Sequence, residues 1–240
     1  MTNWYDATVQ RIEQAAANVR RYWIQVESES QFEFKAGQFV TFDLPIGEKR
    51  AARWRSYSIA SAPDQTNTLE FCIVRSAEGA GTRYFFEEVK IGTKLRFKGA
   101  DGTFYLPEIV DKDLVFICTG TGIAPFRSMI IDTFEQKKVH QNIHLIFGTR
   151  TKKDILYEEE MTVWQQKIPN FTFEITLSRE KTPPYFHGHV HSLYLEKYAA
   201  PRADLAFYLC GWQNMVDEAV ENLTTKMGYR PDQVKFELYG

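Results

Sequence analysis

The feature that most constrains the fold is a change in sequence texture near residue 110. Before this point, short segments with β-type alternation are separated by turn residues, and helical periodicity is almost absent. From Asp113 onward, five apolar strand-like runs alternate with stretches of helical length. The first pattern predicts an antiparallel barrel or sandwich over residues 1–110, and the second predicts an α/β domain with a five-stranded parallel sheet over residues 111–240.

Composition and charge exclude several functional classes. Apolar residues make up 44% of the chain and charged residues 25%, a balance typical of a globular protein with a full core. The formal net charge of -2 provides no global basic field, so we expect no nucleic-acid partner. The first residues lack the pattern of a signal peptide, and no apolar run approaches the ~18 residues of a membrane span. We therefore expect a cytoplasmic protein without a membrane span.

The three cysteines, Cys72, Cys118 and Cys210, each lie inside an apolar strand-like run. This setting predicts small buried hydrophobic residues in a reducing compartment. Because they are also scattered along the chain, they cannot supply the four thiolates of a typical iron–sulfur cluster.

The strongest motif of the first half is R-S-Y-S-I-A-S, residues 55–61. Alternate residues of a strand point to the same face, so Arg55 and Tyr57 are predicted to share one face. Ser56 and Ser58 are predicted to lie on the other face. A cation beside an aromatic ring suits a ligand that contains both a phosphate and a flat ring system.

A second glycine-containing motif follows about twenty residues later. The segment E-G-A-G-T, residues 78–82, places two glycines ahead of a predicted short helix over residues 83–89. Glycines beside a helix N-terminus expose backbone N–H groups to an anion and allow a phosphate to approach closely. A third segment, G-A-D-G-T-F, contains Gly99 and Gly102 and is predicted to form a turn.

The second half opens with a strand-like run followed by T-G-T-G-I-A-P, residues 119–125. Gly120 and Gly122 follow the end of the first strand, which is where α/β sheets bind nucleotides. Pro125 is suited to the first turn of a helix, where a missing N–H group has no cost. The spacing differs from G-x-G-x-x-G, so the standard dinucleotide fingerprint is absent.

Taken together, the motifs R-x-Y-S, G-x-G-T, G-T-G-x-A-P, S-R-E, Y-x-C-G and a terminal E-x-Y occur in an order that resembles the ferredoxin–NADP⁺ reductase family. The resemblance extends from about Thr8 to Gly240. It implies an FAD-binding β-barrel followed by an NADP-binding α/β domain, and electron transfer between NADP(H) and a carrier protein, ferredoxin or flavodoxin. FAD is favoured over FMN by the resemblance alone.

The resemblance also implies roles for the flavin-binding residues. Arg55 would hold a flavin phosphate, Tyr57 would stack on the isoalloxazine ring, and Ser58 would lie near the reactive N5 atom. Ser56 belongs to the same cofactor-binding segment. The flavin pyrophosphate would be cradled by Ala80, Gly81 and Thr82.

The coenzyme-binding residues are implied in the same way. Thr121 would lie where flavin and nicotinamide meet, and Cys210 matches a cysteine that borders the nicotinamide in many relatives. Ser178 and Arg179 match the site of the 2′-phosphate, and Arg150 matches another cation that reaches the coenzyme.

The carboxyl terminus and one histidine depart from the family pattern. Several relatives have an arginine where this chain has His189, which makes NADP binding weaker or sensitive to pH unless a phosphate raises the histidine pKa. Tyr239 is the best candidate to cover the flavin, although Gly240 follows it. Glu237 is either a proton relay or a solvated strand charge. The predicted catalytic residues are therefore Ser58, Cys210, Glu237 and Tyr239.

A run of alternating histidines, His187, His189 and His191, would share one face if it formed a strand. Such a face could bind a metal, but no nearby carboxylate pattern accompanies it and the family offers no support. We expect no metal site.

Three other functions remain open. An NADH-dependent reductase component of an oxygenase or cytochrome system is the main alternative, and Ser178 and Arg179 argue against it. A flavin reductase would release free reduced flavin, and a non-enzymatic subunit of a larger complex would need no external carrier. For the main hypothesis, an acidic carrier would be steered by Lys49, Arg50 and Arg53.

Overall fold

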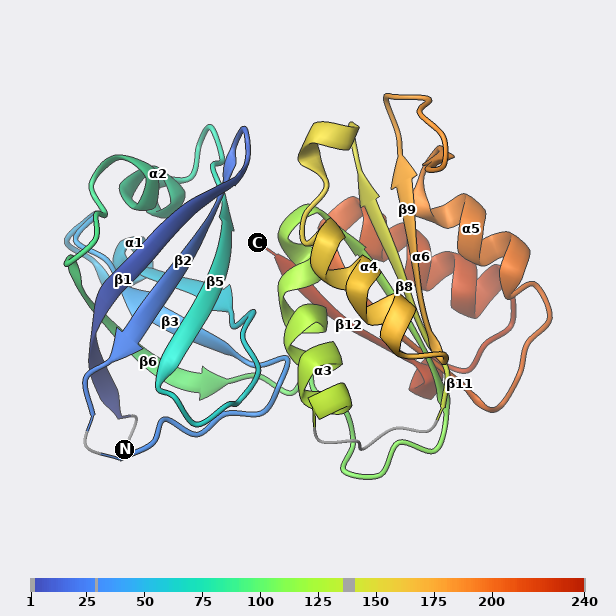
Figure 1. Ribbon diagram of the computed structural model, residues 1–240, viewed down its shortest axis with the longest axis horizontal. Helices are drawn as coiled ribbons and strands as arrows, with labels where there is room; N and C mark the ends of the chain where they lie inside the picture. The colour runs from blue at the N-terminus through green and yellow to red at the C-terminus, as the bar shows by residue number, and fades with distance from the viewer. Residues whose placement is uncertain (1–2, 29, 136–140, 240) are drawn as a thin grey trace. The chain divides into compact units, whose positions relative to one another are not determined.

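The computed structural model describes residues 3–28, 30–135 and 141–239. The chain separates into two compact units, and each is described by itself. The first contains residues 1–106 and 124–136, and the second contains residues 107–123 and 137–240. Figure 1 shows the strands of the first unit in blue to green and most of the second unit in yellow to red.

The first unit contains six antiparallel strands in the order β4-β3-β6-β1-β2-β5. These are β1 (Trp4–Ala16), β2 (Val19–Val26), β3 (Phe39–Asp43), β4 (Trp54–Ser58), β5 (Thr68–Val74) and β6 (Lys94–Asp101), with short helices α1 (Arg50–Arg53) and α2 (Ala80–Glu87). The two outer strands of this order meet, because Ile59 forms an antiparallel bridge with Phe71 just beyond β4. The sheet therefore closes on itself, and the predicted β-barrel is confirmed.

The barrel interior is aromatic. Tyr22, Phe42, Phe71, Phe85 and Phe97 are all fully buried. Phe85 projects from α2 and packs edge-on against Tyr22, whose hydroxyl donates to the Phe85 carbonyl over 2.8 Å. Edge-to-face pairs of this kind stabilise a core beyond the area that they bury. They fix α2 against the barrel, and with it the glycine motif at the N-terminus of α2.

The second unit contains one parallel sheet in the order β10-β9-β8-β7-β11-β12. Its strands are β7 (Asp113–Thr119), β8 (Ile143–Thr149), β9 (Phe171–Leu177), β10 (Phe186–His187), β11 (Leu205–Trp212) and β12 (Val234–Tyr239). The predicted α/β fold is confirmed, but the number of strands, five, was one too low. The additional edge strand β10 pairs only two residues with β9, which is too short to leave a periodic pattern in the sequence.

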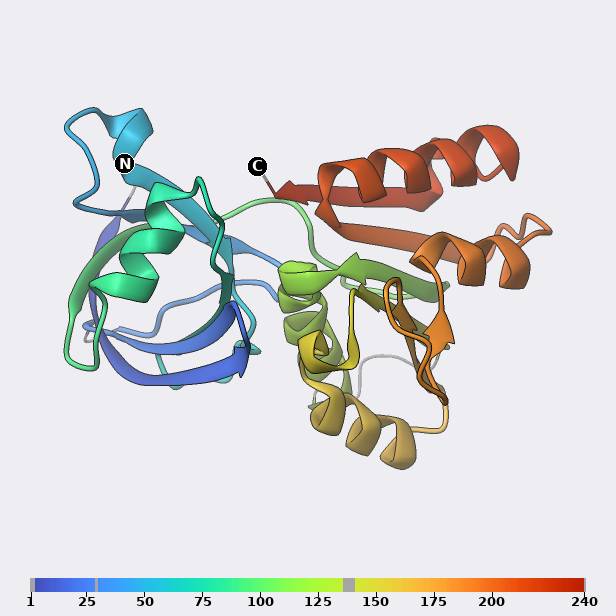
Figure 2. The same cartoon turned by 90° about the horizontal axis from the view of Figure 1, so that it is seen from above.

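Helices cover the sheet of the second unit. These are α4 (Glu158–Lys167), α5 (Val190–Lys197) and α6 (Gln213–Glu221), and α6 continues into a π-helical turn, η3 (Asn222–Lys226). Figure 2 shows α4 on one side of the sheet and α5 and α6 on the other. The chain moves outward from β7 through β8 to β9 and then returns to β11, so the direction reverses between β7 and β11. Ligands of open α/β sheets bind at such a reversal, beyond the carboxyl ends of the strands.

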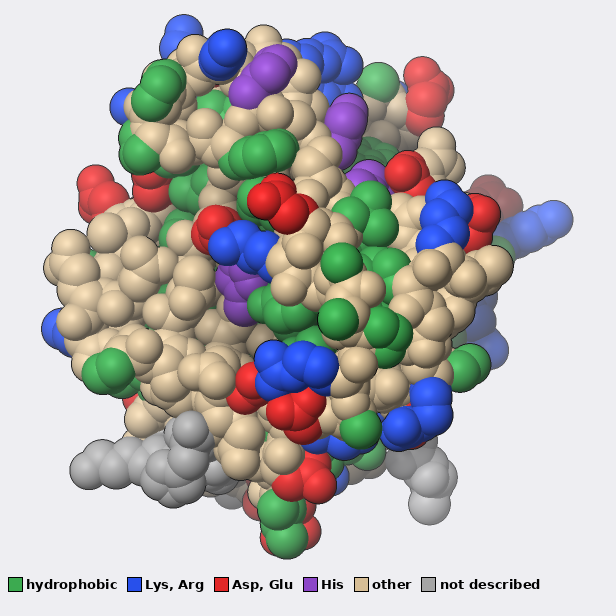
Figure 3. Space-filling model, turned by 90° about the vertical axis from the view of Figure 1, so that its right-hand side faces the viewer, with side chains coloured by type: hydrophobic (Ala, Val, Ile, Leu, Met, Phe, Trp, Pro, Cys, Tyr) green, Lys and Arg blue, Asp and Glu red, His purple; other side chains and the backbone are tan. Residues whose placement is uncertain are grey.

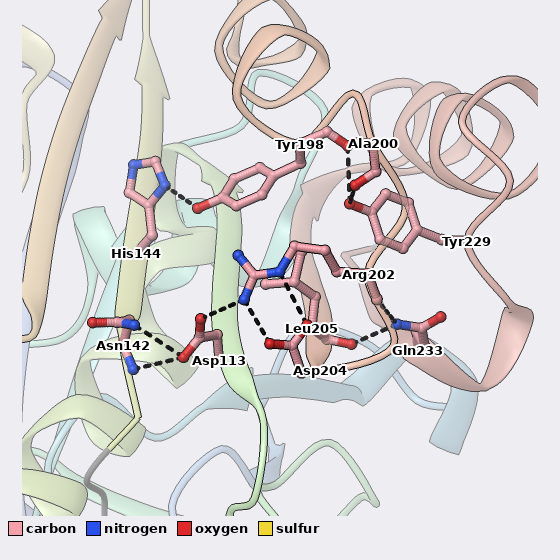
Figure 4. A network of polar contacts seen from close by, with 10 residues as sticks. All are labelled: Asp113, Asn142, His144, Tyr198, Ala200, Arg202, Asp204, Leu205, Tyr229 and Gln233. Atoms are coloured by element: carbon pink, nitrogen blue, oxygen red, sulfur yellow. Dashed lines mark hydrogen bonds and ion pairs between the residues drawn. The ribbon is translucent and has the colours of Figure 1, made fainter.

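The amino ends of the same strands are joined by a polar network (Figure 4). Arg202 donates to Asp113 over 3.0 Å and to Asp204 over 2.7 Å. Asp113 also accepts from the backbone N–H of Asn142 at 3.0 Å, and Gln233 donates to the Leu205 carbonyl at 2.8 Å. These contacts connect β7, β8 and β11 where the strands begin, at the end of the sheet opposite to the expected ligand site.

Several local predictions can be compared with the structure. The cysteines are all buried and free, as expected. The helix predicted over residues 83–89 begins three residues earlier, at Ala80. Gly99 lies inside β6 rather than in a turn, because the pairing shifts there by one residue and leaves a bulge that glycine, at φ +137°, accommodates. Gly102 directly follows that strand. Among the described residues, no helix is both long enough and apolar enough to cross a membrane.

Candidate functional site

The two glycine and arginine motifs of the barrel meet at Gly81. A Cβ atom at this position would lie 2.7 Å from Cγ of Arg55 and 3.1 Å from the hydroxyl oxygen of Tyr57. Only glycine therefore fits without displacing the side chains from β4. Both side chains lie on the same side of β4, as alternation predicts, while the exposed Ser56 hydroxyl lies 2.9 Å from that of Thr41. The site contains a cation, a phenol ring and an open backbone position next to each other.

The Arg55 guanidinium keeps its charge available. Its Nη1 donates to the carbonyls of Ala51 at 3.1 Å and Trp54 at 2.7 Å. Within the described ranges of the chain it has no carboxylate partner. These neutral contacts orient the group without neutralising it, so an anionic ligand can accept charge-assisted hydrogen bonds from it.

Tyr57 is half-buried, and its ring packs against the rings of Phe85 at 5.2 Å and Phe42 at 6.0 Å between centroids. Burial raises the pKa of its phenol well above the ordinary value, so the hydroxyl stays protonated. Ser58 ends the strand and is buried, with 6% of its surface exposed. Its expected position near a flavin N5 atom stays a prediction.

The N-terminus of α2 provides backbone donors for an anion. No side chain caps Gly79, and the first turn contains no acidic residue. The Thr82 hydroxyl accepts from the Ser76 N–H at 3.1 Å and donates to the Gly79 carbonyl at 3.0 Å, which holds the loop in place. The backbone N–H groups of Ala80 and Gly81 have no intrahelical acceptor by geometry, so they remain for a ligand.

In the second unit, the G-T-G loop meets the C-G segment of β11. The loop forms a 3₁₀ turn, η1 (Gly120–Gly122), between β7 and α3 (Ile123–Glu135). A Cβ at Gly122 would lie 2.4 Å from the Cys210 carbonyl oxygen and 2.9 Å from Cα of Gly211. This contact occurs where the sheet reverses direction, and it places Thr121, 9% exposed, at the same point.

Cys210 lies beside this loop as expected, but its side chain is completely buried. It pairs in register with Cys118 on β7, and burial raises the pKa of the Cys118 thiol well above its usual range. Both thiols are therefore protonated and inert in this state. A thiol that approaches a nicotinamide must first be uncovered, so the catalytic role of Cys210 stays a prediction.

Two arginines far apart in the sequence are brought together beyond the ends of β8 and β9. The Ser178 N–H donates to the Thr149 carbonyl at 3.0 Å, and the Arg179 N–H donates to the Arg150 carbonyl at 2.9 Å. The ladder between the strands thus continues into the S-R-E segment. Both arginine side chains are exposed, and neither has an ion-pair partner in the part of the chain that the structure describes. Two unpaired guanidinium groups beside a serine hydroxyl form a site for a dianion.

Glu180, the third residue of S-R-E, is bound internally. Its carboxylate accepts from the Thr182 hydroxyl at 2.6 Å and from the Lys152 N–H at 2.9 Å. These bonds lower the pKa of the carboxyl, with the Thr182 bond as the main cause. The charge is therefore used to connect the loop after β9 to the 3₁₀ turn η2 (Lys152–Asp154).

Sequence reasoning missed two threonines at the strand ends. The hydroxyl oxygens of Thr119 and Thr176 are fully enclosed and have no hydrogen-bond partner among the described residues. A Cβ at Gly148 would lie 3.1 Å from Cγ2 of Thr119 and 3.3 Å from the Thr176 hydroxyl oxygen, so the three residues adjoin. A buried polar group without a partner has a cost of about 1–3 kcal/mol, which a bound ligand can offset. Their position directly before two predicted motifs was the available signal.

The terminal strand β12 places Glu237 opposite Cys210 and Tyr239 opposite Trp212. Glu237 is half-buried. The side chain of Tyr239 lies outside the described part of the structure, so its expected contact with flavin stays a prediction. Trp212, which sequence reasoning did not select, follows Gly211 and is 59% exposed.

The three histidines do not share a strand face. His187 ends β10, His189 precedes the first residue of α5, and His191 lies within that helix. The His191 ring contacts the Tyr194 hydroxyl at 2.7 Å, and burial lowers its pKa. Figure 3 shows histidine side chains at separate places on one face of the molecule. Among the residues described, no cluster of three metal-ligating side chains occurs.

Comparison with known proteins agrees with this geometry. The model of the oxidoreductase FAD-binding domain matches residues 6–105, and that of the oxidoreductase NAD-binding domain matches residues 116–221. Among solved structures, the cytochrome P450 reductase GcoB of Amycolatopsis superimposes with a TM-score of 0.88 at 25% identity, over 99% of this chain and 70% of that one. A ferredoxin–NADP⁺ reductase of Neisseria gonorrhoeae, with bound FAD and NADP, has the same fold, with a TM-score of 0.83 at 24% identity over 98% of both chains.

Curated relatives fall into two groups. The anthranilate 1,2-dioxygenase electron transfer component of Acinetobacter baylyi is 30% identical over 78% of this chain, which spans about half, 53%, of that relative. Ferredoxin–NADP reductase B of Sorangium cellulosum is 32% identical over 87% of this chain and 86% of its own length. The chain therefore belongs to the ferredoxin–NADP reductase family, as an oxidoreductase that uses FAD and NADP(H).

Proposed function

We propose that the protein transfers electrons between NADPH and a separate one-electron carrier of the ferredoxin or flavodoxin type, through bound FAD. The observation that carries this proposal is the pair of unpaired arginines, Arg150 and Arg179, beside Ser178. NADPH differs from NADH only in its 2′-phosphate, so a site for a dianion at the carboxyl ends of β8 and β9 is the feature that distinguishes the two coenzymes.

The barrel residues fit FAD. Arg55 and the N–H groups of Ala80 and Gly81 would hold the pyrophosphate, because a cation and free backbone donors meet where Gly81 leaves room. Tyr57 would contact the isoalloxazine ring, and the segment from Ser56 to Ser58 would line its edge. Bound FAD supplies the conversion between two-electron and one-electron transfer, while the protein positions the reactants and excludes water.

The second unit fits the coenzyme. Ser178, Arg179 and Arg150 would hold the 2′-phosphate through charge-assisted hydrogen bonds. The enclosed hydroxyls of Thr119 and Thr176, next to Gly148, would find their missing partners in the coenzyme that crosses the strand ends. Thr121 in η1 would lie against the nicotinamide. We place FAD binding in residues 1–110 and coenzyme binding in residues 111–240.

Cys210, Glu237 and Tyr239 would complete the nicotinamide site. Glu237 lies directly beside Cys210 in the sheet, so a carboxylate and a thiol end adjacent strands at the direction reversal. In this arrangement Glu237 would relay a proton. Tyr239 would cover the flavin until the nicotinamide displaces it.

The carrier would dock on a surface around Trp54 on the barrel. The Arg50 guanidinium lies 4.6 Å from the centre of the Trp54 ring, and the Lys98 ammonium also lies 4.6 Å from it. Trp4 packs edge-on against Trp54 at 5.5 Å. Arg53, by contrast, forms an ion pair with Asp43, so it contributes less to the field than the sequence suggested. Exposed cations around two tryptophans would attract an acidic partner.

The main competing function is an NADH-dependent reductase component of an oxygenase or cytochrome system. Relatives named as a dioxygenase electron transfer component and a cytochrome P450 reductase favour it. It predicts that the carrier belongs to an oxygenase and that the coenzyme has no 2′-phosphate. The free arginines argue against the second point.

The deciding experiment is an absorption spectrum of the purified protein followed by anaerobic titration with NADPH and NADH. We expect a flavin spectrum that NADPH bleaches at lower concentration than NADH. A colourless protein would favour a flavin reductase, and a flavoprotein that neither coenzyme reduces would favour a non-enzymatic subunit.

The variant Arg179→Ala should lower kcat/KM for NADPH by about tenfold to a hundredfold and change that for NADH much less. Lys181→Ala, which removes an exposed cation two residues away, is the matched control. A ratio of the two coenzyme efficiencies within about twofold of the parent would show that Arg179 does not read the phosphate.

We also propose that the protein works in the cytoplasm. Its three cysteines are buried, free thiols, which is the usual state in a reducing compartment.

A further inference from the structure

The helix that follows the coenzyme loop is hydrogen-bonded to the end of the flavin-binding strand segment. Residues 124–136, which include most of α3, group with the barrel. Nη1 of Arg127 donates to the Ala60 carbonyl at 2.7 Å, and the Ser128 hydroxyl donates to the Ser61 carbonyl at 2.6 Å. Ala60 and Ser61 end the same R-S-Y-S-I-A-S segment that begins with Arg55. Two of the motifs thus contact each other directly.

A buried carboxylate holds this contact in place. Glu70 on β5 is 2% exposed, and its side chain lies between two arginines. Its Oε1 accepts from Nε of Arg21 at 2.6 Å, and its Oε2 lies 3.0 Å from Nη1 of Arg127. The backbone of Glu70 contacts the same segment, since its N–H donates to the Ser61 hydroxyl at 3.1 Å and its carbonyl accepts from the Ala60 N–H at 2.8 Å. Every directed bond at this point converges on Ala60 and Ser61.

We propose that Arg127, oriented by Glu70, is a positioning residue for hydride transfer; this inference rests on the proposed function. The end of the segment lies two residues after Ser58, and the N-terminus of α3 directly follows η1 with Thr121. Arg127 therefore joins the backbone that presents the flavin to the helix that begins at the coenzyme loop. Hydride transfer requires reacting atoms within a few tenths of an ångström of the productive geometry, and misplacement by about 1 Å can cost a hundredfold in rate.

A purely structural role for these charges makes a different prediction. Replacing both members of a buried ion pair by apolar residues of similar volume is often neutral for stability, whereas removing one partner leaves a buried charge unpaired. Arg21 would not be left isolated in such a variant, because it is partly exposed and lies 3.9 Å from Glu13. The double variant Glu70→Met/Arg127→Met therefore removes the directed bonds while it preserves the packing.

The test is anaerobic stopped-flow reduction of the FAD-loaded full-length protein by saturating NADPH. We expect the double variant to keep its thermal midpoint, its FAD content and its half-saturating NADPH concentration. Its limiting rate of flavin reduction should fall by roughly tenfold or more. Oxidation of the reduced protein by ferricyanide should not change, because that step does not involve the coenzyme.

Two further variants complete the design. Arg127→Lys keeps a charge and a donor, so it should recover part of the rate. Glu174→Gln is the matched control, because Glu174 is an ion-paired carboxylate outside both candidate sites and its loss should leave the limiting rate unchanged.

A parental limiting rate in a folded, FAD-loaded double variant would overturn the proposal. If the double variant does not fold, Ser128→Ala replaces it, since it removes only the hydroxyl bond to Ser61, and a parental rate there would be equally contrary. If NADH reduces the parent and NADPH does not, the proposed coenzyme is wrong, and the same comparison with NADH still decides the role of Arg127.

Discussion

Gly81→Ala is expected to weaken FAD binding without weakening the fold. The added methyl group would lie 2.7 Å from Cγ and 3.3 Å from Cδ of Arg55, distances that no real contact maintains. Because the Arg55 side chain is flexible, it would move aside and lose its position against the pyrophosphate. A charge-assisted hydrogen bond is worth about 1.5–3 kcal/mol, so the Kd for FAD should rise by roughly tenfold to a hundredfold. In a helix, alanine is favoured over glycine by about 0.5–1 kcal/mol, so the apoprotein should lose no stability.

The assay is titration of apoprotein with FAD, followed by the quenching of flavin fluorescence, alongside thermal unfolding of the apoprotein. Glu87→Ala in the last turn of the same helix is the control, because Glu87 is 44% exposed and forms only a surface ion pair with Arg75. An FAD affinity for Gly81→Ala within about twofold of the control would refute the cradle that we assign to Gly81.

Three further predictions address other parts of the protein. Arg55→Ala should lose more flavin on dialysis at high salt than Ser56→Ala, and equal flavin content in the two variants would contradict the assigned faces of β4. Carrier reduction should slow as ionic strength rises; a rate that does not change between low and physiological salt would exclude docking steered by charge. The pKa of Glu174 is lowered from 4.5 to about 2, mainly by its hydrogen bond with His144 and also by Lys197. The stabilisation is therefore complete above pH 4.5 and is lost as the pH falls toward 2. Chemical unfolding across this range should show a steeper loss for the parent than for Glu174→Gln, and parallel curves would disprove the effect.

The parts of the fold that could be predicted from sequence were those with a regular period. The five longer strands of the second unit are apolar runs bounded by helices, and their type followed from that pattern. Strand β10 could not be predicted, because two residues show no period and their pairing depends on the neighbouring strand. The bulge at Gly99 could not be predicted either, because a glycine between polar residues is typical of a turn until the pairing partner on β3 is known.

Site residues were predictable where a motif states the backbone geometry. Gly81 and Gly122 were selected as glycines of anion-binding loops, and the structure shows the close contacts that exclude a side chain at both. Thr119 and Thr176 were missed because a threonine at a strand end is common, and only the three-dimensional structure shows that its hydroxyl has no partner. The adjacency of Arg150 and Arg179 likewise depends on parallel pairing of β8 and β9.

The grouping of α3 with the barrel limits how this chain can be divided or recombined. A cut near residue 110 would separate the barrel from Arg127 and from Phe126, whose ring packs edge-on against Phe104 at 5.7 Å. The isolated barrel would then expose an apolar surface and would leave Glu70 with one of its two arginines. A chimera that exchanges the nucleotide-binding half with that of a relative must therefore either keep residues 124–136 with the barrel or match their contacts in the new partner.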